Sequence, residues 1–458
     1  MNRALLRDLY AVAGAALLVL AAVLIGSAVQ RRDGTLRVDA PPLVGHWIPH
    51  VGPGTPAALA VAVAVVAYGP VLAARLRWRP LLLATWVVGQ AWTWSLALID
   101  GWERGVVGRL TTRHEYLQVI DRFADIPAAL AGFTGHILLQ SPDNWPAHVA
   151  GHPPAATLTF VLLDRVGLGG GGWAGAFCIT VGTTAAAAIL VTVRTLADES
   201  LARRAAPFLV LAPAAVWVGA SADGYFAAVT AWAVAFLALA VTGHRPRWTG
   251  LASGLLFGLT LYLSYGLTLF AVIAAAVLFL GRERLRPLPW LLAGFAVLPV
   301  VFTSLGFDWW EAYRTLVTRY YQGAGGIRPY QYWVWANLAC TVLVVGPATV
   351  AGLRRCAVRL GRLRWRPGPP TGRPGRAMGP FGPPRIPDQR LALLIAAAFL
   401  ALLIADLSGM SKAETERIWL PFAVWLLAAC AWLPGPRAWL TAQAVPALLV
   451  NHLVVTGW

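Results

Sequence analysis

Fourteen apolar runs, divided by short polar segments, constrain this 458-residue chain more than any other feature of its sequence. A helix needs about 20 apolar residues to cross a bilayer, and backbone at that depth must satisfy its own hydrogen bonds. The chain is 58% hydrophobic and 12% charged, whereas soluble domains carry about 25% charged residues. The sequence therefore predicts an all-α polytopic membrane protein. The runs lie at 9–29, 56–74, 80–99, 152–169, 173–193, 206–221, 224–242, 249–265, 267–281, 288–305, 332–353, 391–405, 418–433 and 436–457.

Basic residues indicate how these helices are oriented. The formal net charge is +17, but the arginines gather at the ends of apolar runs and form no continuous basic face. We therefore expect orientation signals and no nucleic-acid partner. Because arginine-rich loops stay in the cytoplasm, we expect an inner amino end and an outer carboxyl end. The expected cytoplasmic segments are 75–79, 194–204, 245–247, 282–286 and 354–390.

One apolar run does not fit the parity of this topology. Two runs lie between the expected outer loop at 100–151 and the expected inner loop at 194–204, where only an odd number of crossings fits. The run at 152–169 opens with His-Pro-Pro and ends beside a glycine stretch, so we expect it to be re-entrant or interfacial. About thirteen transmembrane helices remain. The expected parts are a membrane domain at 1–353 with the large outer loop 100–151, a basic Pro/Gly-rich cytoplasmic linker at 354–390, and C-terminal transmembrane helices at 391–458.

The first candidate site residues follow the third run. Asp100 closes that run, and Glu115 stands in the loop beyond it, next to Arg113 and His114. A carboxylate held against the membrane face is partly desolvated, which raises its pKa and suits it to act as a general base. We therefore predict Asp100 and Glu115 as catalytic residues, and the choice between them stays open. The alternative is that these acids only solvate the loop.

Histidines are concentrated in the same region. Six of the eight fall in the first two outer loops or at their boundary with the membrane, His152. Their spacings match no compact metal motif, so we predict no metal site and assign Arg113, His114 and His152 to substrate binding. The four cysteines show no paired spacing, so we expect neither a disulfide nor a zinc site.

A second set of candidates lies in two later outer loops. Arg328 follows a glycine-containing stretch, and the turn at 411–421 reads Ser-Lys-Ala-Glu-Thr-Glu-Arg-Ile-Trp-Leu-Pro. Arginine and lysine bind phosphate, arginine in a bidentate fork. The expected phosphate-binding set is Arg328, Lys412, Glu414, Glu416 and Arg417, with the glutamates orienting the cations. A structural ion-pair cluster that caps a helix is the alternative. We interpret Asp223, in a short turn, as a hairpin marker, and a functional role is the alternative there.

Taken together, these residues resemble the GT-C type membrane glycosyltransferases, which use polyprenyl-phosphate sugars on the outer side of the membrane. The resemblance rests on the outer loop with Asp100 and Glu115, on Gly-His-Pro-Pro at 151–154, and on the turn at 414–421. The segments His-Glu-Tyr and Glu-Thr-Glu-Arg-Ile-Trp-Leu-Pro-Phe are similar to those of bacterial envelope pentosyl or methylthioxylose transferases. Two features depart from the family: the two carboxylates are separated rather than adjacent, and no soluble carboxyl-terminal domain is seen.

The resemblance implies an inverting glycosyltransferase, multi-pass in the plasma membrane of a bacterium. Asp100 or Glu115 would take the proton of an acceptor hydroxyl, and Lys412, Arg417 or Arg328 would meet the departing polyprenyl phosphate. The implied partners are a polyprenyl-phosphate sugar donor, an envelope glycan or lipoglycan acceptor, and the lipid bilayer. A divalent cation at the phosphate fits the resemblance, but the sequence does not require one.

Two other functions also fit a chain of this kind. A multi-helix transporter or a lipid-linked-glycan flippase carries ionisable residues near mid-membrane in both halves, whereas here they crowd the expected outer loops. A non-catalytic assembly partner would tolerate replacement of the outer carboxylates.

Overall fold

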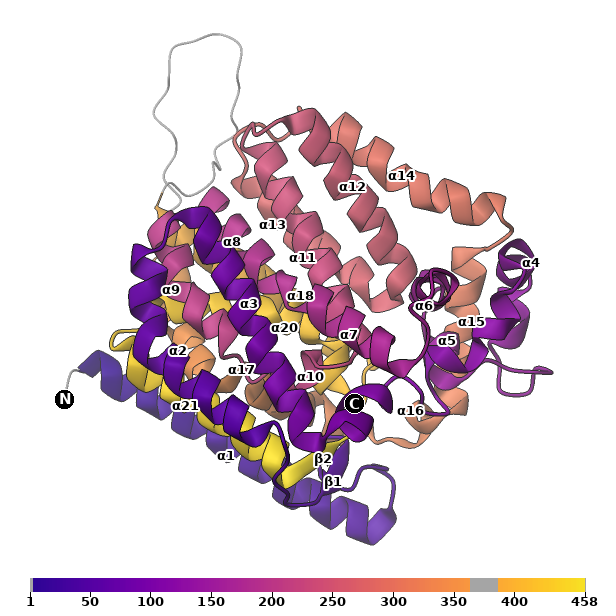
Figure 1. Cartoon of the computed structure of the whole chain (residues 1–458), viewed down its shortest axis with the longest axis horizontal. Helices are drawn as coiled ribbons and strands as arrows, with labels where there is room; N and C mark the ends of the chain where they lie inside the picture. The colour runs from indigo at the N-terminus through magenta and orange to yellow at the C-terminus, as the bar shows by residue number, and fades with distance from the viewer. Residues whose placement is uncertain (1–2, 363–385, 458) are drawn as a thin grey trace.

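The protein is a bundle of helices with one short sheet (Figure 1). The structure is a computed structural model that describes residues 3–362 and 386–457 and is 77% helical, which confirms the all-α class. Within those residues the one sheet is the antiparallel pair β1 (Gly45–Trp47) and β2 (Val454–Thr456). The α-helices are α1 (Arg3–Asp33), α2 (Thr55–Arg75), α3 (Trp78–Ala97), α4 (Ile126–Ala131), α5 (Ala147–Gly151), α6 (Ala155–Arg165), α7 (Gly171–Gly182), α8 (Thr184–Leu196), α9 (Glu199–Val210), α10 (Ala215–Val218), α11 (Ala222–Val241), α12 (Pro246–Leu263), α13 (Phe270–Leu280), α14 (Leu288–Ser304), α15 (Trp309–Gln322), α16 (Ala324–Ile327), α17 (Tyr330–Leu360), α18 (Pro387–Leu407), α19 (Thr415–Ile418), α20 (Leu420–Leu426) and α21 (Pro436–Leu453).

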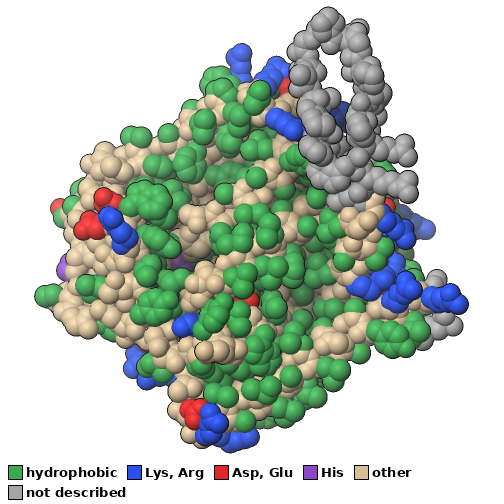
Figure 2. Space-filling view, turned by 180° about the vertical axis from the view of Figure 1, so that it is seen from behind, with side chains coloured by type: hydrophobic (Ala, Val, Ile, Leu, Met, Phe, Trp, Pro, Cys, Tyr) green, Lys and Arg blue, Asp and Glu red, His purple; other side chains and the backbone are tan. Residues whose placement is uncertain are grey.

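Several of these helices are long and apolar enough to cross a membrane. The described residues contain seven such helices, or up to eight if the bent pair α14 and α15, which turns by 76°, is counted as one span. Large apolar side chains cover the outside of these helices, among them Leu17, Val63 and Val300. In a view from behind, hydrophobic side chains spread across the face while lysine and arginine gather mainly near its edges (Figure 2). The protein therefore has the surface of a membrane protein.

The count of about thirteen crossings is not confirmed. Several predicted runs form helices below the length that a span needs: α13 has 11 residues and α20 has 7. The run at 152–169 forms α6, which also has 11 residues. Other predicted runs are divided into shorter helices, as at the Leu-Ala-Pro sequence between α9 and α10. Hydropathy detects apolar residues, but it does not show where proline and glycine end a helix.

The expected linker at 354–390 is only partly described. α17 continues to Leu360 and α18 begins at Pro387, so both ends of the expected linker belong to helices, and residues 363–385 lie outside the described chain. At the end of α17, buried Asp8 of α1 accepts 2.6 Å ion pairs from Arg354 and Arg355. These pairs hold α1 against α17 at the end of the bundle remote from β1 (Figure 1).

Helix α11 is the centre of the bundle. It contacts α7, α8, α12, α13 and α20, and 83% of its most apolar 18-residue stretch is buried. Its sequence is rich in alanine, which lets neighbouring backbones approach closely. A Cβ added at Gly182 of α7 would lie 3.0 Å from the carbonyl carbon of Gly224. The first turn of α11 is consequently fixed in place by its neighbours.

A kink in α17 is stabilised by a side chain from α21. Gly346 has left-handed backbone (φ 76°) just before Pro347, which interrupts the helical hydrogen bonds. Fully buried Gln443 accepts from the Ala348 N–H at 3.1 Å and donates to the Val345 carbonyl at 2.5 Å. In an apolar surrounding, backbone groups released by a kink need such partners.

We expect Gln443→Leu to lower the free energy of unfolding by about 1–3 kcal/mol, because it leaves two buried backbone groups unpaired. Chemical unfolding in detergent measures the change. The matched control is Gln389→Leu, since Gln389 makes one exposed 3.4 Å contact to the Arg362 carbonyl, and its effect should stay within about 0.5 kcal/mol. Equal effects of the two substitutions would contradict this account of the kink.

Candidate functional site

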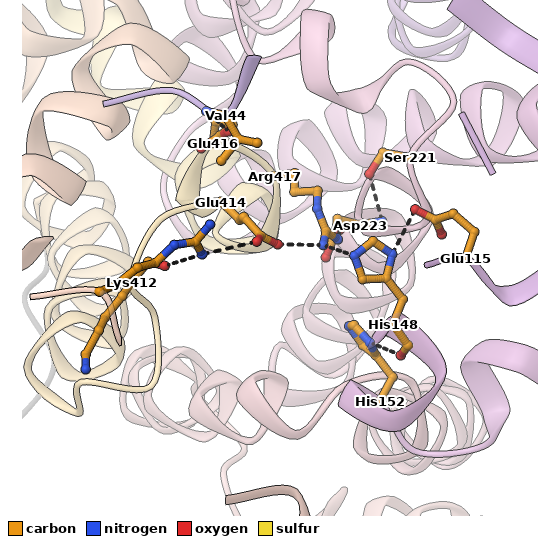
Figure 3. Close-up of polar contacts among 11 residues, drawn as sticks. Val44, Glu115, His148, His152, Ser221, Asp223, Lys412, Glu414, Glu416 and Arg417 are labelled. Atoms are coloured by element: carbon orange, nitrogen blue, oxygen red, sulfur yellow. Dashed lines mark hydrogen bonds and ion pairs between the residues drawn. The ribbon is translucent and has the colours of Figure 1, made fainter. Parts of the chain in front are cut away.

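Six side chains from distant parts of the chain form one line of polar contacts (Figure 3). We call it the charged network, and its members are Glu115, His148, Asp223, Arg328, Glu414 and Arg417. They come from the loop after α3, from α5, from the start of α11, from the junction of α16 and α17, and from α19 with the residue before it. The structure therefore joins four of the residues that the sequence predicted with two that it did not.

Glu115 and His148 form one end of the network. The two side chains are about 6% and 10% exposed, and His148 Nδ1 lies 2.8 Å from Glu115 Oε1. Arg417 approaches His148 Nε2 at 2.8 Å, and because a guanidinium can only donate, Nε2 is the acceptor and Nδ1 carries the proton. The imidazole is therefore neutral, with its N–H on the side of the carboxylate.

The second oxygen of Glu115 has no such neighbour. Glu115 Oε2 is buried and has no hydrogen-bond partner among the described residues. A buried carboxylate oxygen without a partner is rare, because its desolvation is not compensated. This oxygen is therefore the acceptor position of Glu115 that no described group fills.

Arg417 is the centre of the network. Its guanidinium contacts Asp223 Oδ2 at 2.6 Å and Glu414 Oε2 at 3.2 Å. Burial by itself lowers the pKa of Arg417, but the nearby carboxylates of Asp223, Glu414 and Glu115 outweigh burial and raise the pKa above its ordinary value. The arginine is held as a permanent buried cation.

Local backbone structure positions Asp223. Ser221 is the N-cap of α11, and its hydroxyl accepts from the Asp223 N–H at 3.2 Å. Asp223 thus lies in the first helical turn, where the helix dipole favours an acid. Its side chain is only 5% exposed, so its pairing with Arg417 compensates a buried charge. The hairpin-marker interpretation of Asp223 overlooked this role.

Glu414 bridges the two arginines. Its Oε1 lies 3.3 Å from Arg328 and its Oε2 lies 3.2 Å from Arg417. Burial by itself raises the pKa of Glu414, but Arg417 and Arg328 outweigh burial and leave the pKa below its ordinary value. Arg328 also donates to the carbonyls of Leu36 and Lys412, at 3.1 and 2.9 Å. Both arginines are thus fixed by contacts that do not involve Glu414.

His152 stabilises the segment that carries His148. Its Nδ1 donates to the His148 carbonyl at 2.8 Å, and its ring lies edge-on to Tyr116 with centroids 5.7 Å apart. Burial lowers the pKa of His152 to about 4. The side chain is therefore neutral at physiological pH and acts as a hydrogen-bond donor to the segment that carries His148.

Stability should fall in acid because of His152. The unfolded chain, with a His pKa near 6.5, binds more protons than the folded protein between pH 6.5 and about 4. Stability is thus complete above pH 6.5 and is lost as the pH falls toward 4, by up to about 3 kcal/mol. His152→Asn, whose amide can replace the Nδ1 donor, should remove this part of the pH dependence. Thermal unfolding of both proteins across this range is the measurement, and parallel pH curves would contradict the assignment.

Asp100 lies in a different cluster. It contacts His50 Nε2 at 2.7 Å and Arg109 at 2.5 Å, and Arg104 lies 3.7 Å away. Arg109 in turn donates to the Thr456 carbonyl of β2 at 2.5 Å. Both Asp100 oxygens are thus engaged by histidine or arginine side chains, in contacts that link the end of α3 to the sheet. The structure does not bring Asp100 and Glu115 into one network.

The remaining predicted residues surround the network. Arg113 is exposed and donates to His114 Nε2 at 3.1 Å. Burial lowers the pKa of His114, and the nearby His148 and Arg113 lower it further. Lys412 points away from Glu414 (Figure 3) and donates from Nζ to the Gly325 carbonyl at 2.8 Å.

Glu416 is the most buried of the predicted residues. One oxygen accepts from the Val44 N–H at 3.0 Å, and the other lies 3.3 Å from Cys340 Sγ. Burial raises the pKa of Glu416. These contacts fix the turn that carries Glu414 and Arg417 against the segment that leads to β1. Glu416 therefore holds two members of the network in position.

His148 and Asp223 are the members that sequence reasoning did not include. His148 stands four residues before His152, a spacing that places two side chains on one helical face, and this was the available signal. No group of three or more His, Cys, Asp or Glu side chains in the described chain is arranged to hold a metal ion. All four cysteines are buried and unpaired with one another.

An apolar cavity lies among the helices of the bundle. Its walls come from α3, α9, α10, α11 and α20, and from the junction of α7 and α8, and include Thr93, Thr183, Leu209, Val218, Ala227 and Val424. Ala227 lies four positions beyond Asp223 on α11, about one helical turn. Helix α11 therefore contributes both to the network and to the cavity wall.

Comparison with known proteins identified no relative: no family model, no curated protein and no solved structure matches this chain.

Proposed function

We propose that the protein is a membrane glycosyltransferase that moves a sugar from a polyprenyl-phosphate donor to a hydroxyl of an envelope glycan or lipoglycan, with inversion, at the outer face of the plasma membrane. The observation that carries this proposal is the charged network. It holds a buried carboxylate with one unpaired oxygen at one end and two fixed arginines at the other. A base and an anion-stabilising group in one site are what transfer from a phosphate requires.

In the proposed reaction, the acceptor hydroxyl attacks the anomeric carbon while its proton passes to Glu115 Oε2. The bond from that carbon to the phosphate oxygen breaks, and polyprenyl phosphate leaves with the electron pair. Arg417 and Arg328 stabilise the charge that develops on this phosphate, since both are already oriented by other contacts. His148 orients the Glu115 carboxylate through its Nδ1 proton.

The base in this proposal is Glu115 and not Asp100. Each oxygen of Asp100 lies within 2.7 Å of an arginine or histidine side chain, so both acceptor positions of this carboxylate are already occupied. Glu115 keeps one oxygen without a partner. The isoprenoid tail of the donor would lie between the apolar helices of the bundle.

Chain-dependent transfer from labelled donors tests the proposal. Membranes with and without the protein are incubated with a panel of radiolabelled polyprenyl-phosphate pentoses and hexoses. Labelled glycan together with released polyprenyl phosphate, only where the protein is present, is the expected result. Movement of intact labelled lipid across the bilayer, with no bond cleaved, would favour the transporter or flippase instead.

A further inference from the structure

Glu414 differs from the other members of the charged network in how it is held. Its two contacts with the arginines, at 3.3 and 3.2 Å, are longer than the 2.6 Å contact between Arg417 and Asp223. Its side chain is 28% exposed, against 9% for Arg328 and 6% for Arg417. Glu414 is thus the member that solvent reaches, and the arginines lie behind it.

The backbone that carries Glu414 is strained. Ala413 and Glu414 both adopt left-handed conformations, with φ of 69° and 63°. A residue other than glycine in this region costs on the order of 1 kcal/mol or more, and two in succession are uncommon. The conformation that places the carboxylate between the arginines is therefore one that the turn would leave if another anion took its place.

A phosphate offers the arginines the same chemistry. It presents several oxygens with negative charge, and guanidinium groups bind it as they bind a carboxylate. Without Glu414, Arg417 would keep its contact with Asp223, and Arg328 would keep its contacts with the carbonyls of Leu36 and Lys412. Both guanidinium groups would remain in position to receive the anion.

We propose that Glu414 occupies the phosphate-binding position of this site and withdraws when a substrate phosphate binds between Arg328 and Arg417. Glu414 is then an internal competitor, and the 413–414 turn is the segment that moves. The inference rests on the proposed function in one respect only, namely that the phosphate belongs to an isoprenoid lipid. It predicts binding, whereas the proposed function predicts bond cleavage, so each can fail without the other.

The test measures phosphate binding to the full chain in detergent, with wild type, Glu414→Gln and the control Glu311→Gln. Glu311 is an exposed acid on α15, so its substitution makes the same charge change outside the network. The probes are farnesyl phosphate, inorganic phosphate and farnesol, followed by isothermal titration calorimetry. Glu414→Gln should bind farnesyl phosphate roughly tenfold more tightly than wild type, because the like-charged competitor is gone. Farnesol binding and the control should not change.

The outcomes divide clearly. Tighter binding of farnesyl phosphate alone supports the inference and assigns the site to a lipid phosphate. Tighter binding of inorganic phosphate as well supports an anion site for which the headgroup suffices. Unchanged or weaker binding of both overturns the inference. If Glu414→Gln does not fold, Glu414→Asp replaces it: its carboxylate keeps the charge but is too short to bridge both arginines, so a smaller gain of the same sign is expected, and no gain would overturn the inference.

Discussion

Replacing Glu115 by glutamine is expected to lower the rate of glycosyl transfer by about 10²–10⁴-fold, the usual contribution of a general base. Glutamine keeps the shape of the side chain and can still accept from His148, but it cannot take a proton from the acceptor hydroxyl. The substrate-binding residues are untouched, so the donor concentration at half-maximal rate should change little. Initial rates with a radiolabelled polyprenyl-phosphate sugar, normalised to folded protein, give the comparison.

Asp100→Asn is the informative partner of this variant. Both substitutions convert an acid to its amide, but Asp100 lies among His50 and Arg109, outside the charged network. Asp100→Asn should keep most of the activity per folded molecule. The opposite result, with Asp100→Asn inactive and Glu115→Gln active, would mean that the proton passes to Asp100 and that the network has another role.

Replacing Arg417 by methionine is expected to cost about 3–5 kcal/mol of stability, the usual effect of removing one member of a buried ion pair. Methionine has a similar length but leaves Asp223 buried without its 2.6 Å partner and takes a donor from His148 Nε2. Arg314→Met is the matched control, because Arg314 is exposed on α15, and it should change stability by less than about 0.5 kcal/mol. Chemical unfolding in detergent measures both.

A second substitution separates charge from packing. Arg417→Met combined with Asp223→Asn removes both partners of the pair, so no buried carboxylate remains without its cation, and part of the lost stability should return. No recovery in the double variant would mean that Arg417 stabilises the protein through packing. A loss below about 1 kcal/mol for Arg417→Met alone would show that the pair behaves as an exposed one.

Hydropathy was sufficient to predict an all-α membrane protein but not how its helices end. The apolar run at 224–242 became the single helix α11, because nothing in it interrupts helical hydrogen bonds. The run at 206–221 became the end of α9 and the four residues of α10, because Pro213 and its neighbours break it. The number of spans depends on such breaks, and buried partners such as Gln443 decide whether a break is tolerated.

The site was predicted in part for a similar reason. Charged residues beside apolar runs were visible in the sequence, and Glu115, Arg328, Glu414 and Arg417 do meet in the structure. Their order in the network could not be derived, because it depends on contacts between segments up to 269 positions apart in the chain. Asp100 and Glu115 looked equivalent because both adjoin apolar sequence, but Asp100 is paired with His50 and Arg109 and Glu115 with His148 of α5, which the local sequence does not indicate.

The pairing of β1 with β2 has a consequence for the order in which the protein is made. The two strands come from nearly opposite ends of the described chain, with Gly45 opposite Thr456. During synthesis, amino-terminal segments emerge and insert first. The backbone groups of β1 therefore stay unpaired until β2 is made, when almost every helix is already in the bilayer. The hydrogen bond from Arg109 also forms late, since its acceptor is the carbonyl of Thr456. The rim of the bundle that holds the sheet therefore closes last, and a ribosome paused before β2 would leave a bundle whose helices are inserted but whose rim at the sheet is still open.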